Sequence, residues 1–259
     1  MALNFSLREI YFNKIFLHLS VDDLLNIRCV CRIFFKLINE YFQQVQYLDC
    51  SSSNSFKAKK SNWPKISMLI YKNKSISELN LMNCKWVNEK RFIELIRSQN
   101  HLKSINLSWT FHITRKSLAT IALYCPVLER ISLENCSWLQ PFEVLLLADN
   151  CSKLSHLNLG SCWNLNDETI RQILEKRGKS IKSLNLSKIY SLSDSSMSSI
   201  KSLAHSLYSL DIKYCWKVTD EGLRNVCQSR NLKRISLTGC FAITWLGHQH
   251  LEEFNIEIY

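Results

Sequence analysis

Apolar positions recur along this chain with a long and regular period. From residue 76 onward, a nine-residue pattern carries leucine or isoleucine at its first, fourth and sixth positions and returns seven times. Its fourth position falls at residues 79, 105, 131, 157, 184, 210 and 235, so the successive steps are 26, 26, 26, 27, 26 and 25 residues. Such a fixed period is typical of proteins built from stacked structural repeats.

Each repeat predicts one short strand followed by one helix. Apolar and polar residues alternate in Leu157-Asn158-Leu159 and its equivalents, which is the period of an extended chain. Capping residues then precede apolar positions spaced three and four apart, and we expect helices after Thr114, Asn166, Ser193 and Thr219. One strand and one helix cannot bury their apolar faces alone, so neighbouring repeats must stack. The sequence therefore predicts an α/β solenoid in the shape of a curved horseshoe.

The first fifty residues follow a helical period instead. Ser6 stands three residues before Glu9, and Ser20 stands three residues before Asp23, which is the spacing of a capping box. A third apolar helical run lies between Phe34 and Phe42. Three short helices make a marginal core, so this segment should lean on a neighbouring domain or a partner.

Composition and charge limit the possible classes of protein but do not identify a binding partner. The formal net charge is +11, and the densest basic stretch lies between Lys57 and Lys74. Without interleaved stacking residues, we interpret this stretch as a solvated loop and helix face. No apolar run reaches the length of a membrane-spanning helix, and the N-terminus meets charge too early for a signal peptide. We expect a cytoplasmic or nuclear protein.

Cysteine usage points to reduced thiols inside the repeats. The chain has eleven cysteines, none of them in the paired CxxC arrangement of structural zinc sites. No metal site and no cofactor are predicted. The sequence also shows no clustered Ser/His/Asp set, paired carboxylates or glycine-rich phosphate loop, so we expect a protein that is not an enzyme.

The repeats resemble the cysteine-containing class of leucine-rich repeats. Cysteine ends the pattern at Cys84, Cys136, Cys162, Cys215 and Cys240. Thr110 and Ile189 hold the same position without a thiol, and isoleucine cannot donate a hydrogen bond. We interpret the cysteines as small buried residues that close a turn, and we expect the turn after Leu186 to pack differently.

Residues 5–44 resemble the F-box. The match rests on Leu7, Glu9, Ile10, Ile15, Leu17-His18-Leu19, Ser20, Asp23-Leu24-Leu25, Val30-Cys31-Arg32 and Phe34-Phe35. Arg8 stands where the family usually has proline, and Phe34 or Phe35 where tryptophan is common, which implies weaker preorganisation. The chain would then comprise an F-box (5–44), an atypical first repeat with a basic connecting segment (45–75), seven leucine-rich repeats (76–244) and a closing segment (245–259).

Together, these resemblances imply a non-catalytic subunit of a Skp-cullin-F-box ubiquitin ligase that holds a protein substrate on its repeats. The F-box of this family binds a Skp-type adaptor, which links it to a cullin and a RING subunit. The residues expected to contact the adaptor are Leu7, Ile10, Ile15, Leu19, Leu24, Leu25, Val30, Cys31, Phe34 and Phe35.

Two surfaces are candidates for holding the substrate. Polar residues beside the strand leucines should line one face of the sheet. Just past the strands lies an aromatic series whose members could contact a partner or pack loop against loop: Trp86, Trp138, Trp163, Tyr190 and Trp216, with Trp109 or Phe111 and Phe241 in equivalent places.

Two other interpretations stay open at this point. The chain could be a repeat-only protein-interaction solenoid, or an RNA-binding solenoid favoured by its positive charge and its aromatic series. At the C-terminal end, residues 245–259 depart from the repeat register. Leu251, Phe254, Ile256 and Ile258 predict a short strand that closes the last repeat.

Overall fold

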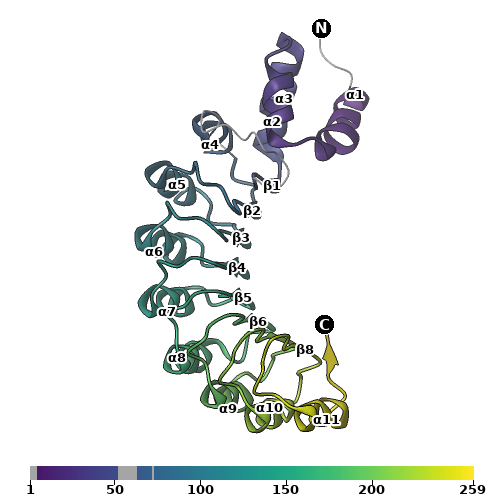
Figure 1. Cartoon of the computed structure of the whole chain (residues 1–259). Coiled ribbons are helices and arrows are strands. Elements are labelled where there is room, and N and C mark those ends of the chain that lie inside the picture. Colours follow the sequence, from purple (N-terminus) through teal and green to yellow (C-terminus); the bar gives the residue numbers. More distant parts are fainter. Residues whose placement is uncertain (1–4, 52–62, 72) are drawn as a thin grey trace.

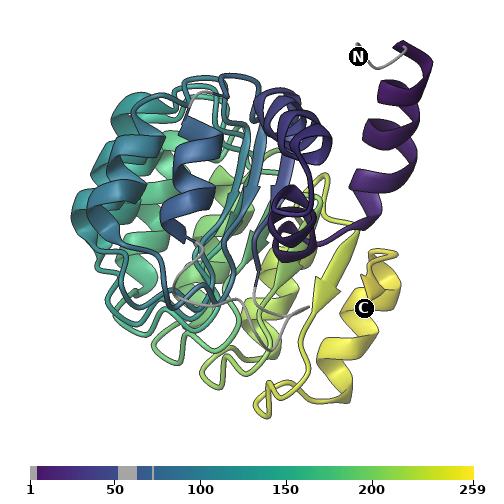
Figure 2. The same ribbon diagram turned by 90° about the horizontal axis from the view of Figure 1, so that it is seen from above.

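The chain forms a curved solenoid with a parallel sheet on its inner side and helices on its outer side (Figure 1). The computed structural model describes residues 5–51, 63–71 and 73–259. Figure 2 shows the same two layers from above. Among the residues that the structure describes, no helix is long and apolar enough to cross a membrane.

Nine strands pair in sequence order, each parallel to the next. The seven predicted strands are present as β2 to β8, with one further strand at each end. The bounds are β1 (Tyr47–Asp49), β2 (Glu78–Asn80), β3 (Ser104–Asn106), β4 (Arg130–Ser132), β5 (His156–Asn158), β6 (Ser183–Asn185), β7 (Ser209–Asp211), β8 (Arg234–Ser236) and β9 (Glu257–Ile258).

The helices between these strands form the outer layer, and the helical segments of an N-terminal module precede the sheet. The outer helices are α4 (Trp63–Tyr71), α5 (Glu89–Ile96), α6 (Arg115–Tyr124), α7 (Pro141–Asn150), α8 (Asp167–Arg177), α9 (Asp194–Leu203), α10 (Asp220–Cys227) and α11 (Trp245–Glu253). The N-terminal module comprises α1 (Phe5–Ile10), the π-helical turn η1 (Tyr11–Ile15), the 3-10 turn η2 (Phe16–His18), α2 (Val21–Arg28) and α3 (Arg32–Gln44).

The fold is the predicted α/β leucine-rich-repeat solenoid, with the pattern leucines between the two layers. Leu157 and Leu159 of one repeat are almost fully buried, as are their equivalents in the other repeats. The closing strand at Ile258 pairs with β8 as predicted, whereas α11 before it was not predicted. Of the basic stretch between Lys57 and Lys74, residues 57–62 and 72 lie outside the described residues.

A left-handed residue lies three residues after each strand from β2 to β8. The backbone φ is 62° at Trp109, 58° at Lys188 and 60° at Tyr214, and equivalent residues in the other repeats share this conformation. The N–H of Trp109 donates to the carbonyl oxygen of Glu134 in the next repeat at 2.9 Å. Six such bonds between Asn83 and Tyr214 offset the steric cost of a left-handed conformation at residues other than glycine.

The repeat cysteines close these turns as buried hydrogen-bond donors. The thiol of Cys136 donates to the carbonyl oxygen of Leu107 at 3.3 Å, one repeat earlier. Burial raises the pKa of this thiol to about 12, so it stays protonated at neutral pH. Ile189 lacks the donor, yet its N–H still bonds the carbonyl oxygen of Leu186. The expected difference in the turn after Leu186 is therefore wrong for the backbone, and only the thiol bond is missing.

Carboxylates at the start of one helix hold the cap of the next. Asp194 accepts hydrogen bonds from the N–H and hydroxyl of Thr219, at 2.8 and 2.7 Å. Glu89, Asp167 and Asp220 do the same one repeat before Thr114, Ser193 and Thr244. The predicted caps at Thr114, Asn166, Ser193 and Thr219 are present. The caps at Thr114, Ser193, Thr219 and Thr244 therefore also join two repeats, whereas Arg115 and Pro141 stand in the place of the acid in the repeats before Gln140 and Asn166.

A glycine in α10 makes room for one of these carboxylates. A Cβ at Gly222 would overlap Oδ1 of Asp194, and that oxygen is held in place by the N–H of Thr219. The equivalent residue one repeat earlier is Ser196, whose hydroxyl donates to the carboxylate of Asp167 instead. Only a very small or a hydrogen-bonding side chain fits at this position.

Gly222→Ala should therefore destabilise the protein. Helix propensity alone predicts a gain of up to about 1 kcal/mol, whereas overlap with a fixed carboxylate predicts a loss of about 1 to 3 kcal/mol. Thermal unfolding, monitored by circular dichroism, measures whether the substitution raises or lowers stability. Ser202→Ala, at an exposed position of α9, is the matched control and should change stability little. A more stable Gly222→Ala protein would show that Asp194 is free to move.

The carboxylates that bond the cap of the next helix should also make the stability of the protein fall in acid. Burial opposes ionisation of Asp220 and Glu89, but the hydrogen bonds from Thr244, or from Thr114 and Ser117, outweigh it and lower the pKa of each carboxyl. The stability they contribute is complete above the unfolded pKa values of about 4 and is lost as pH falls through the folded ones.

The melting temperature should accordingly drop between about pH 5 and about pH 3, and Asp220→Asn should reduce both the melting temperature at neutral pH and the size of that drop. An Asp220→Asn protein with an unchanged pH profile would contradict this role.

Candidate functional site

The N-terminal module is held together by a cluster of aromatic rings. The ring of Phe16 is buried and lies 5.4 Å from that of Tyr41, centroid to centroid, while Tyr11 meets Phe34 edge-on at 5.8 Å. Such edge-to-face pairs stabilise a small core beyond the area that they bury. The predicted capping box at Ser20 is present, whereas α1 already contains Ser6, so the predicted cap at that residue is wrong.

The module and the first repeat share one continuous core. The buried amide of Asn73 donates to the carbonyl oxygens of Phe42 and Val45, both at 2.8 Å, and so ties the end of α3 to the segment before β2. Burying this amide is possible because its donors are satisfied. The N-terminal helices therefore lean on the repeats, as their small size predicts.

The residues predicted to contact an adaptor divide into two groups. Leu24 and Leu25 are buried in the module's own core. Leu19 and Phe34 are half-buried against the core. The exposed members are Ile10, Ile15, Val30, Cys31 and Phe35; Leu7 lies in α1, and its side chain is outside the described part of the structure.

The turn between α2 and α3 concentrates the exposed apolar side chains. Val30 is 71% exposed, Ile33 53% and Phe35 46%, within six residues of one another. The guanidinium of Arg28 lies 4.3 Å from the centroid of the Phe35 ring and also donates to Asn39. Ile33 was not among the predicted contacts. We call Val30, Ile33 and Phe35 the turn patch.

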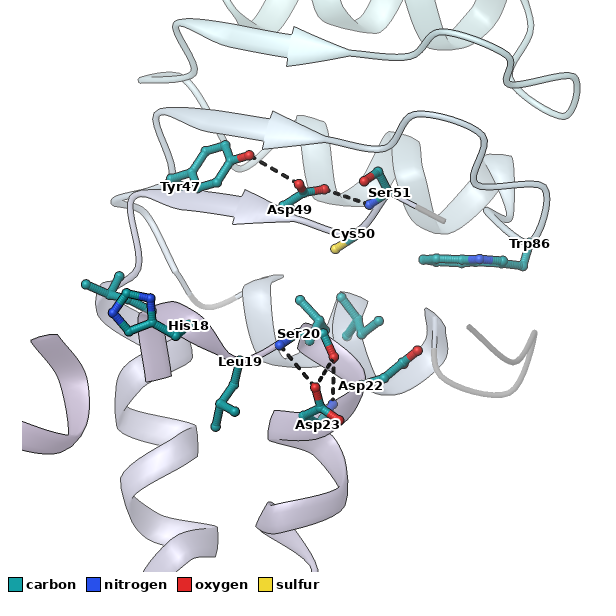
Figure 3. A pocket seen from close by; sticks show the side chains of 13 residues that line it. His18, Leu19, Ser20, Asp22, Asp23, Tyr47, Asp49, Cys50, Ser51 and Trp86 are labelled. Atoms are coloured by element: carbon teal, nitrogen blue, oxygen red, sulfur yellow. Dashed lines mark hydrogen bonds between the residues drawn. The ribbon is translucent and has the colours of Figure 1, made fainter. Parts of the chain in front are cut away.

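A pocket marks the junction of the module and the repeats (Figure 3). It encloses about 390 Å³ between η2, α2 and β1. Asp49 accepts from the N–H of Ser51 at 2.8 Å, and Asp23 accepts from the N–H and hydroxyl of Ser20. Burial raises the pKa of the Cys50 thiol. These hydrogen bonds of Asp49 and Asp23 serve a turn and a helix cap, and no group of three metal-ligating side chains was found within the described ranges.

The predicted aromatic series occupies two different places. Trp86 and Trp138 follow the cysteine position by two residues and pack against the core, and the indole N–H of Trp138 donates to the carbonyl oxygen of Thr110 at 3.0 Å. Exposed rings follow it by one residue at Phe111 and, in four successive repeats, at Trp163, Tyr190, Trp216 and Phe241, whereas the exposed Trp109 precedes it by one residue. Trp86 and Trp138 are thus structural, and the predicted single row is wrong.

The four exposed rings lie along the loop edge of the last repeats. The Tyr190 and Trp216 rings stack with centroids 4.4 Å apart and planes inclined by 20°. Trp163 is 54% exposed and Phe241 80%. We call Trp163, Tyr190, Trp216 and Phe241 the aromatic ridge. The one-residue offset from the cysteine was the signal in the sequence that separates it from Trp86 and Trp138.

The polar residues of the inner face mainly turn the chain at the strand ends. The side-chain oxygen of Asn106 accepts from the N–H of Ser108, and that of Asn185 from the N–H of Ser187, at 3.0 and 2.8 Å. These Asx turns leave the amides less free for recognition than the sequence suggested. Arg130 bridges to Glu78 two repeats away at 2.9 Å. Part of the polar groups of the inner face is thus occupied by contacts within the chain, beside an open hollow of about 460 Å³ on the same face.

Comparison with known proteins gives distant similarities. No family model matches the chain. It is 27% identical over 176 residues to the DNA repair protein rhp7 of Schizosaccharomyces pombe, covering 68% of this chain and 29% of the relative. It is 28% identical over 215 residues to the SCF E3 ubiquitin ligase complex F-box protein pof2 of the same yeast, covering 82% and 39%. The chain therefore spans about a third of the length of these relatives.

A solved structure shows a similar solenoid. The crystal structure of the Rad7 and Elc1 complex in yeast aligns with a TM-score of 0.62 at 15% identity, covering 87% of this chain and 70% of that one. At this level of identity the likeness concerns the fold alone.

The two kinds of aromatic residue should respond differently to removal. Trp138→Ala should cost about 2 to 4 kcal/mol, because it opens a space against the core and leaves the Thr110 carbonyl unpaired, whereas Trp216→Ala should cost less than about 1 kcal/mol. Chemical denaturation of the two variants measures both. Equal losses would show that the ridge is part of the packing.

Proposed function

We propose that this chain is a substrate-recognition subunit of a Skp-cullin-F-box ubiquitin ligase, acting in the cytoplasm or the nucleus. Its N-terminal module would be an F-box that binds a Skp-type adaptor, and its repeats would hold a protein substrate. The observation that carries the proposal is the turn patch, an exposed apolar surface on a helical module whose core is otherwise complete. Exposed apolar clusters of this kind mark protein contacts.

The comparisons support the same class of protein. The similarity to pof2 spans most of this chain, and pof2 is named as an F-box protein of an SCF ubiquitin ligase complex. Rad7, whose solenoid is similar, was crystallised in complex with another protein, Elc1. The order of residues from Leu7 to Phe35 also resembles the F-box sequence in the segment that is proposed to bind the adaptor.

The mechanism would be proximity. An adaptor that holds its substrate near the activated ubiquitin raises the effective concentration of substrate lysines and supplies no acid, base or nucleophile. Buried thiols such as Cys136, whose pKa is raised to about 12, suit this role because they are poor nucleophiles. The shared core through Asn73 would keep the adaptor and the substrate at a fixed separation.

Changing the turn patch should abolish adaptor binding without unfolding the module. Val30→Glu combined with Phe35→Ser places a charge and a small polar group on exposed positions, and should reduce recovery of a Skp-type adaptor in a pull-down by at least about tenfold. The matched control is Leu123→Glu with Phe142→Ser, two exposed apolar residues on the outer helices. It should bind the adaptor normally.

Leu24 and Leu25 are unsuitable for this test because their removal would damage the module's core. A folded turn-patch variant that recovers as much adaptor as the unchanged protein would remove the basis for the F-box assignment. So would failure of the unchanged protein to bind any Skp-type adaptor.

A further inference from the structure

The aromatic ridge is an exposed apolar surface that the fold itself does not require. Its rings project from loops whose backbone is already fixed by the left-handed residue and the buried cysteine. An earlier repeat builds the same turn with Ser137 at the ridge position. The rings therefore contribute little to the stability of the turns that carry them, and they leave apolar surface exposed to water.

The loops of the ridge also carry positive charge. Residues 160–166, 187–193, 213–219 and 238–244 contain Lys188, Lys213 and Lys217 and no aspartate or glutamate. The ammonium group of Lys188 lies 5.5 Å from the centroid of the Tyr214 ring, while that of Lys213 lies 3.8 Å from the carboxylate of Asp211 on the inner face. The ridge is thus an apolar strip beside ammonium groups.

Three of the acids on the helix side are committed to the fold, while Glu168 and Glu221 beside them are exposed. Asp167, Asp194 and Asp220 begin the helices after these loops, and each accepts hydrogen bonds from the cap of the following helix. Their charges reduce the local positive potential, but their oxygens already have partners. The lysines at the ridge can therefore pair with acids of another molecule.

Ring geometry favours a polypeptide over a nucleic acid. Bases bind single-stranded nucleic-acid proteins by stacking on free aromatic faces, but Tyr190 and Trp216 stack on each other and so cover their facing surfaces. Their exposed edges and the neighbouring Trp163 and Phe241 suit aliphatic and aromatic side chains, which is how amphipathic rings act at protein interfaces.

We infer that the aromatic ridge binds an extended acidic segment of a partner protein, with aliphatic or aromatic residues between its acids. The rings would take the apolar side chains, and Lys188 and Lys217 the carboxylates. This inference deepens the proposed function. It rests on that function only where the acidic segment is taken to belong to the ligase substrate. Binding at the ridge can be measured without any ligase subunit.

A random twelve-residue peptide library displayed on phage, selected on the immobilised full chain, tests the inference. Enriched peptides should combine acids with apolar residues. As synthetic peptides, they should lose at least about tenfold in affinity when Trp163→Ala and Trp216→Ala are combined, or when Lys188→Glu and Lys217→Glu are combined. Their affinity should also fall as salt is raised.

The matched controls are Phe142→Ala and Lys153→Glu, an exposed ring and an exposed lysine away from the ridge. They should leave peptide affinity unchanged, and circular dichroism should show all variants folded.

Three results would overturn the inference: no enrichment of peptides, enrichment of peptides without acids, or peptide binding that neither ridge variant weakens. Tighter, ridge-dependent binding of a twelve-nucleotide oligouridylate would replace it with a nucleic-acid surface. None of these outcomes depends on adaptor binding, which the turn-patch variant tests separately.

Discussion

The hydrogen bond from a left-handed residue to the next repeat keeps the loops of this solenoid in register. Each central strand is only three residues long, so the sheet ladder alone would leave the loops beyond it unconnected. The bonds made from residues such as Ser161 and Lys188 extend the register past the strand ends. Because the register continues into the loops, equivalent side chains of neighbouring repeats come side by side, as Tyr190 and Trp216 do.

A second set of contacts fixes the opposite, helical side of each loop. Carboxylates at Asp167, Asp194 and Asp220 each bond the cap of the next helix, and Gly222 leaves the space that one of them needs. The loops that end at Ser193, Thr219 and Thr244 are thus anchored at their strand end and at their helix end. The surface between these anchors is free to vary without cost to the fold, which is where the ridge is found.

The sequence predicted the repeats well because their period is set by the geometry of stacking. Leucine spacing located seven strands, and capping residues such as Asn166 and Thr219 located helix starts. It failed where a side chain's direction depends on a shift of one residue. Trp138 and Trp163 looked equivalent, yet one donates inward to Thr110 and the other faces solvent.

The same difficulty explains the N-terminal module. A helical period cannot say which side of a helix meets its own core and which meets a partner, so Leu24, Leu25, Val30 and Phe35 were grouped together. Burial separates them, and it shows Ile33 as an exposed residue that the period alone did not select. Contacts between repeats, such as Asp194 to Thr219, join residues 25 positions apart, so no local pattern reveals them.

In the proposed function, the adaptor binds the N-terminal module and the substrate binds the loops of the last repeats, at different parts of one chain. Hydrogen exchange of the full chain, measured with and without a purified Skp-type adaptor, tests this most directly. The account predicts added protection in the N-terminal module around the α2–α3 turn and none in the loops between residues 160 and 244. Protection in those loops, or no protection around Val30 and Phe35 at saturating adaptor, would contradict it.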